Sequence, residues 1–178
     1  MRHIIAAFVI AACAGPALAE TPQKTDPIAS IEAGVICAPD AVGTAPAPNT
    51  LAGETHIIDI NPPFVSHSRR VPAVLGIGFG VKTLAAQPDG LGEVTVIVTH
   101  PPMGDAAVEL QSFASSIGGL DPSLTFYQFD YAYELVPGTW EMAAMRGSDV
   151  LYKVSFDVLP PALVPELAAV CGYLDLLS

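Results

Sequence analysis

Residues 139–158 read TWEMAAMRGSDVLYKVSFDV, and this stretch decides the fold. Apolar and polar side chains alternate along two runs, with a turn at Arg146-Gly147-Ser148-Asp149 between them. The side chains expected to point inward are Trp140, Met142 and Ala144, then Val150, Tyr152, Val154, Phe156 and Val158, opposed in the second run by Leu151, Lys153, Ser155 and Asp157. A period of two is typical of a β-strand with one buried face. The stretch therefore predicts an antiparallel hairpin.

Similar alternation upstream predicts further strands. The segments are 30–37, 56–60, 73–84, 93–99 and 126–135, and Gly or Pro turns separate several of them. In the last of these the expected buried face carries Tyr127, Phe129, Tyr131, Tyr133 and Leu135. Because sheets with one apolar face must cover one another, we predict an all-β antiparallel sandwich of about seven strands in a single domain over 30–178.

Three segments do not fit this strand pattern clearly. Residues 108–117 suit a short helix and a strand equally well. Residues 39–55 include Ala45-Pro46-Ala47-Pro48-Asn49 and predict a long loop, which is either mobile or functional. Pro165 and Gly172 flank an apolar stripe, and Pro at the start with Gly just past the end predicts a short C-terminal helix near 165–171.

The N-terminal residues 1–19 have the three-part pattern of a secretory signal peptide. Arg2 precedes an apolar run, and Ala17-Leu18-Ala19 is a typical cleavage site. We therefore expect a periplasmic or secreted protein that begins near Glu20, with a flexible leader over 20–29 and no membrane span in its mature form. Lipoprotein anchoring through Cys13 is an alternative, although it would leave an unusually short apolar region.

Cleavage after residue 19 would leave two cysteines, Cys37 and Cys171. Two cysteines in an oxidising compartment usually pair, so we expect a disulfide that ties the first strand to the C-terminal segment. A redox or metal-binding thiol pair is disfavoured because the C-x-x-C spacing is lacking.

The chain is acidic, with 18 Asp and Glu against 7 Lys and Arg and a net charge of −11. Such a surface repels phosphate backbones and anionic headgroups, which disfavours nucleic acid and membrane-surface partners. The expected partner is instead an envelope protein or a small ligand.

Two features suggest where a ligand could bind. Arg69-Arg70 is an adjacent basic pair that could hold a carboxylate or phosphate, although pairing with acidic neighbours would also explain it. Gly76, Gly78 and Gly80 lie on one face of a predicted strand and leave a trough, which either a ligand or another part of the chain could fill. A nucleotide loop is disfavoured because these glycines do not precede a helix.

A second hypothesis is a copper site. Histidine with methionine is a plausible copper set in an oxidising compartment, and the candidates are His67, His100 and Met103, although nothing in their spacing places them together. Hydrolase motifs such as G-x-S-x-G and H-E-x-x-H are absent from the sequence. We therefore expect no catalytic residues and no cofactor, and we predict a non-catalytic binding or accessory module.

Four short segments also carry a family resemblance. They are LGIGFGV at 75–81, HPP at 100–102, ELVPGTW at 134–140 and FDVLPP at 156–161. With them the chain resembles an uncharacterised family of bacterial exported domains of unknown function over roughly residues 31–161. The closing hairpin is also similar to the last strands of immunoglobulin-like modules. The resemblance implies export and an immunoglobulin-like β-sandwich, and it implies no catalytic residues.

Overall fold

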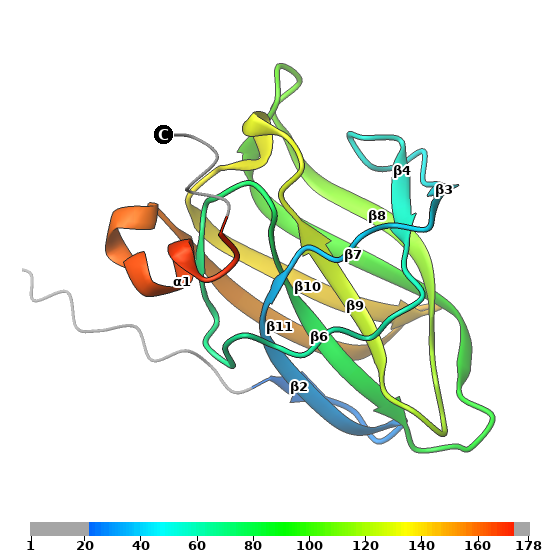
Figure 1. Cartoon of the computed structure of the whole chain (residues 1–178). Coiled ribbons are helices and arrows are strands. Elements are labelled where there is room, and N and C mark those ends of the chain that lie inside the picture. The colour runs from blue at the N-terminus through cyan, green and yellow to red at the C-terminus, as the bar shows by residue number, and fades with distance from the viewer. Residues whose placement is uncertain (1–21, 173–178) are drawn as a thin grey trace, which may run out of the picture.

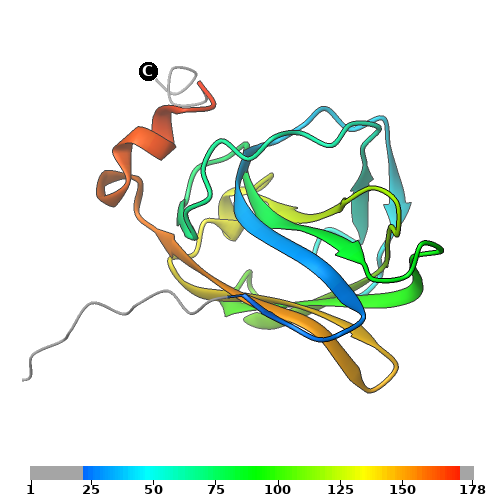
Figure 2. The same cartoon turned by 90° about the horizontal axis from the view of Figure 1, so that it is seen from below.

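The computed structural model describes residues 22–172, which form two β-sheets packed face to face (Figure 1 and Figure 2). The larger sheet contains, in spatial order, β1 (Gln23–Lys24), β11 (Asp149–Leu159), β10 (Gly138–Arg146), β7 (Leu91–Met103) and β8 (Val108–Ile117), with β5 (Arg70–Pro72) beside β11. The smaller sheet contains β2 (Ile28–Cys37), β6 (Ile77–Ala85) and β9 (Ser123–Gln128). A separate hairpin consists of β3 (Gly43–Pro46) and β4 (Glu54–Ile57).

The strand order is that of an immunoglobulin-like sandwich. Of the seven main strands, the first, second and fifth (β2, β6 and β9) share one sheet, and the third, sixth and seventh (β7, β10 and β11) share the other. The fourth strand, β8, pairs with β7. These main strands pair in antiparallel fashion, whereas the short β5 runs parallel to β11. The predicted fold class and the approximate number of strands are therefore confirmed.

Aromatic side chains from both sheets fill the space between them. Phe79 of β6 lies edge-on to Trp140 of β10, with ring centroids 5.7 Å apart, and its centroid is 4.8 Å from that of Phe156 on β11. All three side chains are fully buried. Burial of each large apolar side chain contributes roughly 1.5–3 kcal/mol to stability. Because Trp140 and Phe156 occupy the alternate positions of 139–158, the period-two pattern explains why the two sheets close on each other.

The inward stripe of β11 differs from the prediction at its start. Val150 was expected to point inward, but it is 45% exposed, whereas Leu151 is buried. The pairing with β10 shifts between Ala144, which faces Tyr152, and Met145, which faces Val150. Such a bulge places one extra residue in a strand and changes which side chains point inward. Leu151 therefore takes the core position that alternation assigned to Val150.

The predicted strand over 126–135 is wrong in its second half. Strand β9 ends at Gln128, and a 3-10 helix, η1, covers Ala132–Glu134. The Glu134 carboxylate accepts backbone N–H groups of Asp130 and Tyr131, and such local bonds compete with strand pairing. As a result Tyr131 and Tyr133, expected in the core, lie at the surface with their rings stacked 5.2 Å apart.

Four segments upstream also differ from their predicted form. The loop predicted over 39–55 contains β3 and the start of β4, so it is a hairpin, and the strand predicted over 56–60 ends at Ile57. The strand predicted over 73–84 begins only at Ile77, because the chain turns at Gly76, which has a φ of +77°. The part of the leader predicted over 20–29 that the structure describes is ordered: Gln23–Lys24 pairs with β11, and Ile28 is fully buried.

The remaining segments follow the sequence more closely. Residues 108–117, which suited a helix and a strand equally, form β8. After β11 come a 3-10 turn, η2 (Pro161–Leu163), and a five-residue helix, α1 (Pro165–Ala169), in the region predicted to be helical. Cys37 at the end of β2 and Cys171 just beyond α1 form the predicted disulfide, with their Cα atoms 5.4 Å apart.

The predicted signal peptide over 1–19 and the alternative anchor at Cys13 lie outside the described residues. Within residues 22–172, no helix has the length and apolar character needed to cross a membrane.

Candidate functional site

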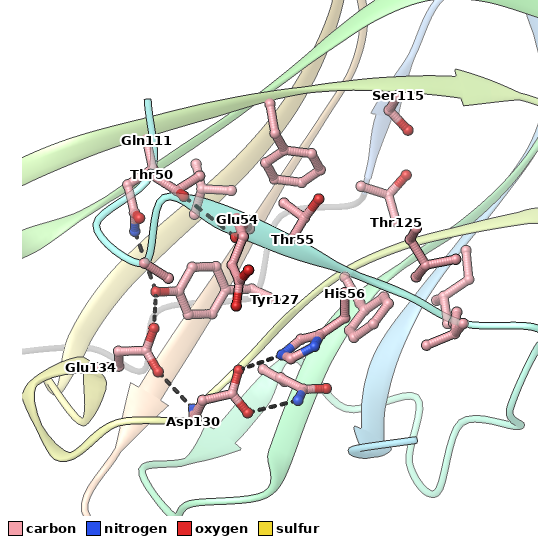
Figure 3. A pocket seen from close by; sticks show the side chains of 18 of the residues that line it. Thr50, Glu54, Thr55, His56, Gln111, Ser115, Thr125, Tyr127, Asp130 and Glu134 are labelled. Atoms are coloured by element: carbon pink, nitrogen blue, oxygen red, sulfur yellow. Dashed lines mark hydrogen bonds and ion pairs between the residues drawn. The ribbon is translucent and has the colours of Figure 1, made fainter. Parts of the chain in front are cut away.

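A pocket opens at one edge of the sandwich, where β8 ends the larger sheet and β9 ends the smaller one (Figure 3). The β3–β4 hairpin lies over the gap between these two strands, and residues 50–58 form one side of the pocket. The cavity has a volume of about 370 Å³. This size is within the range of small-molecule sites, which are typically clefts of about 300–1,000 Å³.

Three contacts tie the hairpin to both sheets. The backbone N–H of Ser112 in β8 donates to the carbonyl of Asn49 over 3.2 Å, and the N–H of Leu51 donates to Gln111 Oε1 over 2.8 Å. On the other side His56 Nε2 lies 2.8 Å from Asp130 Oδ2, in the segment that follows β9. The hairpin is thereby linked to the edge of each sheet and covers the opening between them.

The pocket wall combines aromatic, hydroxyl and ionisable side chains. The aromatic rings are Phe113, Phe126, Tyr127 and Tyr131; the hydroxyl groups are Thr50, Thr55, Ser115 and Thr125; the ionisable groups are Glu54, His56, Asp130 and Glu134. Two amides, Gln111 and Gln128, complete the polar set. The positions 111, 113 and 115 are alternate residues of β8, so their side chains share the strand face toward the pocket.

A hydrogen-bonded chain runs along the inner end of the pocket (Figure 3). Gln111 Nε2 donates to the Tyr127 hydroxyl over 3.2 Å, and this hydroxyl donates to Glu134 Oε1 over 2.7 Å. The other Glu134 oxygen accepts the N–H groups of Asp130 and Tyr131 at 2.6 and 2.9 Å. Glu134 is only 5% exposed. Its carboxylate therefore holds the 128–134 segment against β9.

Burial shifts the protonation of this chain. It raises the pKa of Glu134, while the hydrogen bonds from Tyr127 and the backbone counteract part of that rise. Burial also raises the pKa of Tyr127, and the nearby negative charge of Glu134 adds to the effect. The Tyr127 hydroxyl therefore keeps its proton and remains a hydrogen-bond donor to Glu134.

Three buried polar atoms of pocket residues have no hydrogen-bond partner within the described residues. They are His56 Nδ1, Thr125 Oγ1 and Gln128 Oε1. Thr125 is 4% exposed, and its hydroxyl lies beside the hydroxyl of Tyr152, the neighbouring polar group with which it interacts. Because buried polar atoms almost always have partners, these three atoms are places in the pocket wall where hydrogen bonding is incomplete.

The predicted ligand residues do not line this pocket. Arg69 and Arg70 lie at the start of β5, and Arg70 Nη2 donates to the carbonyl of Leu163 over 3.2 Å. In the described part of the chain, neither guanidinium has a carboxylate within ion-pair distance. The predicted anion contacts at this pair therefore stay untested, and the arginines are separate from the cavity.

The glycine trough is filled by the chain itself. A methyl group built on Gly80 would overlap the Thr125 carbonyl oxygen and lie 2.7 Å from the Phe126 Cα, while one on Gly78 would lie 3.0 Å from Ile36 Cγ1. Gly76 does not belong to the strand, because it is in the preceding turn. The glycines therefore allow close packing between neighbouring strands. This agrees with the interpretation that another part of the chain fills the trough.

The three candidate copper ligands have different surroundings. His67 is exposed and lies edge-on to Phe64, with ring centroids 5.4 Å apart. His100 is buried and stacks on Trp140, and both of its ring nitrogens are engaged: Nδ1 donates to the Pro101 carbonyl and Nε2 accepts from Gln111. Burial lowers the pKa of His100, which favours this neutral ring. Met103 is buried in the core.

Sequence reasoning missed the pocket residues for identifiable reasons. Glu134 was placed on the solvent side of a strand, and Gln111 lay in a segment left undecided between helix and strand. The sequence did contain one signal, because Glu134 directly follows the aromatic residues of 127–133. A charged residue beside such a run is rarely buried unless it has partners.

Comparison with known proteins gives a family match and a similar solved structure. A family model described as "Domain of unknown function (DUF3859)" matches residues 26–158. Among solved structures, the chain is similar to an immunoglobulin-like protein from Pseudomonas aeruginosa, with 20% sequence identity and a TM-score of 0.46; the match covers 79% of this chain and 98% of that chain. None of the curated proteins compared with the chain matches it.

Proposed function

We propose that the chain, which belongs to the family described as a domain of unknown function (DUF3859), is an exported, non-catalytic binding module whose small ligand occupies the pocket under the β3–β4 hairpin. The observation that carries the proposal is the cavity of about 370 Å³, whose wall combines aromatic rings with hydroxyl, amide and carboxylate groups. A bound molecule would form hydrogen bonds with the polar groups of the wall and cover its aromatic rings.

The position of the pocket supports a binding role. Loops and edges of an immunoglobulin-like sandwich can vary while the sheets hold them in place, so binding sites are commonly built there. Here the two walls belong to β8 and β9, whose inner neighbours form the core, and the hairpin closes the third side. The site is therefore formed before a ligand arrives, and little ordering is needed on binding.

The arrangement of His56 supports binding more than catalysis. Its Nε2 is held by Asp130, as in a general-base pair, but Nδ1 has no hydrogen-bond partner among the described residues. A nucleophilic site would place a hydroxyl or thiol within hydrogen-bond reach of that free nitrogen. In the described residues, no hydroxyl or thiol makes a hydrogen bond with that nitrogen.

Export is supported by two features of the chain. Residues 1–19 have the pattern of a signal peptide, and Cys37 is positioned to pair with Cys171, which suits an oxidising compartment. We therefore place the binding role in the periplasm or outside the cell, where an envelope protein could also use the module as an accessory.

The test is a ligand screen by two-dimensional NMR on the mature protein and a pocket-filled variant. We expect hits from a library of small polar compounds to shift the amide signals of residues lining the pocket. Ser115→Phe should abolish these shifts, because position 115 faces the cavity. Ser116→Phe is the matched control, since the neighbouring residue is exposed on the opposite face of β8. Hits that map elsewhere, or that survive Ser115→Phe, would refute the proposal.

A further inference from the structure

The charges around the pocket are unbalanced. Its lining includes the carboxylates of Glu54, Asp130 and Glu134, and the lining residues include no Lys or Arg. The ion pairs found in the described residues are His56 with Asp130 and Lys153 with Glu141, of which the second lies away from the pocket. An anionic ligand would meet repulsion from three acidic groups, whereas a cation would be attracted by all of them.

The hydrogen-bonding groups are also unbalanced, with acceptors in excess. Gln128 Nε2 already donates to Asp130, which leaves Gln128 Oε1 as a buried acceptor without a donor. His56 Nε2 lies 2.8 Å from the same carboxylate, and in the tautomer that donates there Nδ1 is a second acceptor without a donor. Gln111 Nε2 is occupied by Tyr127 and His100. A ligand that fits must therefore be rich in donors.

Aromatic faces lie beside these acceptors. Tyr131 lines the pocket and is 46% exposed, and its ring stacks on that of Tyr133 with an angle of only 6° between the two planes. The face of an aromatic ring attracts a cation within about 6 Å of its centre. The stacked pair therefore presents an electron-rich surface next to Asp130.

From these observations, and resting on the proposed binding function, we infer that the pocket takes a small organic cation, an alkylammonium or guanidinium compound. An ammonium group has three donors and no acceptor, and a guanidinium group has five donors and no acceptor. Either would donate to the carboxylates of Glu54 and Asp130, which also match its charge. Its carbon chain would pack on the aromatic rings of the wall.

The test compares three compounds of equal chain length by calorimetric titration of the mature protein at low ionic strength. They are 1,4-diaminobutane, 1,4-butanediol and succinate, which carry positive, neutral and negative end groups. We expect the diamine to bind at least about tenfold more tightly than the other two, a difference of about 1.4 kcal/mol. Added salt should weaken its binding, since the partly exposed charges are screened.

Two variants test whether the pocket carboxylates cause the preference for the diamine. Glu54→Gln should weaken diamine binding roughly two- to tenfold, as expected for one charge pair near the surface. Glu54 is exposed at the mouth of the pocket, so this change should leave folding intact. Glu32→Gln is the matched control, because it removes the same charge from an exposed position of β2 that does not line the pocket. Equal losses in the two variants would overturn the inference, since the attraction would then come from the net charge of the whole protein.

The outcomes separate this inference from the proposed function. If butanediol or succinate binds in the pocket as tightly as the diamine, the ligand is not a cation, and the pocket is still a binding site. If none of the three compounds binds, the cation class is likewise overturned. The proposed function fails only when the wider NMR screen finds no compound whose binding depends on position 115.

Discussion

At the scale of single residues, a glycine on the outer face of the small sheet lets another part of the chain pack closely against it. Gly34 faces the ring of Phe64, and a methyl group at Gly34 would lie 2.7 Å from that ring. Lys82 Nζ lies 5.2 Å from the centre of the same ring, so Phe64 is held between the glycine and the ammonium group. The glycines are therefore packing residues, and the cavity lies at the opposite, β8–β9 edge.

This close packing predicts the effect of a single methyl group. Gly80→Ala should lower the free energy of unfolding by about 1–3 kcal/mol, because its Cβ would collide with the backbone of Thr125 and Phe126, which cannot move freely. Urea unfolding measures the difference. Gly92→Ala is the control: its Cβ would have no heavy atom within 4 Å, so it should change stability by less than about 0.5 kcal/mol. Equal effects in the two variants would disprove the packing role.

At the scale of elements, the β3–β4 hairpin is the part of the pocket that depends most on others. Its two strands pair only with each other among the described strands, and an isolated two-stranded hairpin is marginally stable in water. The contacts to Gln111, Ser112 and Asp130 therefore hold it over the pocket.

Removal of one anchor should loosen this element. Gln111→Ala leaves the Leu51 N–H without its acceptor and removes the amide that links His100 and Tyr127. We expect a loss of about 1–3 kcal/mol in stability and faster hydrogen exchange of amides in residues 43–57. Gln87→Ala, at an exposed turn, is the control and should leave exchange in the hairpin unchanged. Unaltered exchange in Gln111→Ala would show that the hairpin is held by other contacts.

At the scale of the whole molecule, the disulfide joins positions 134 residues apart. One end is the last residue of β2 and the other follows α1, whose five residues are too few to be stable as an isolated helix. The bond therefore attaches the C-terminal segment to the small sheet and restricts the unfolded chain.

Removal of the disulfide should lower the stability of the protein. The loop-entropy model gives about 5 kcal/mol for a loop of this length, and measured values are often smaller. We expect the Cys37→Ser, Cys171→Ser double variant to unfold at lower urea concentration and to show early hydrogen exchange in α1. The control is the unaltered protein, whose unfolded form should have no reactive thiol at these positions. Equal stability of the two proteins would contradict the assigned role.

The sequence by itself determined that this protein consists of packed antiparallel β-sheets. Side-chain alternation is local information, so residues 139–158 and the shorter segments upstream were enough to predict two sheets. The two cysteines outside the predicted signal peptide allowed a single pairing. The alternation pattern gave wrong burial at two places. Hydrogen bonds to Glu134 end the strand before Tyr131 and Tyr133. A bulge changes the face on which Val150 lies.

Only the tertiary structure decided where the pocket lies and what lines it. His56, Gln111 and Asp130 come from a hairpin, a strand of one sheet and a segment that follows a strand of the other. No spacing in the sequence relates them, because their proximity follows from the packing angle and edges of the two sheets. Arg69, Arg70 and the glycines had clear sequence patterns but lie elsewhere, since a pattern along the chain records local chemistry and not the distances created by folding.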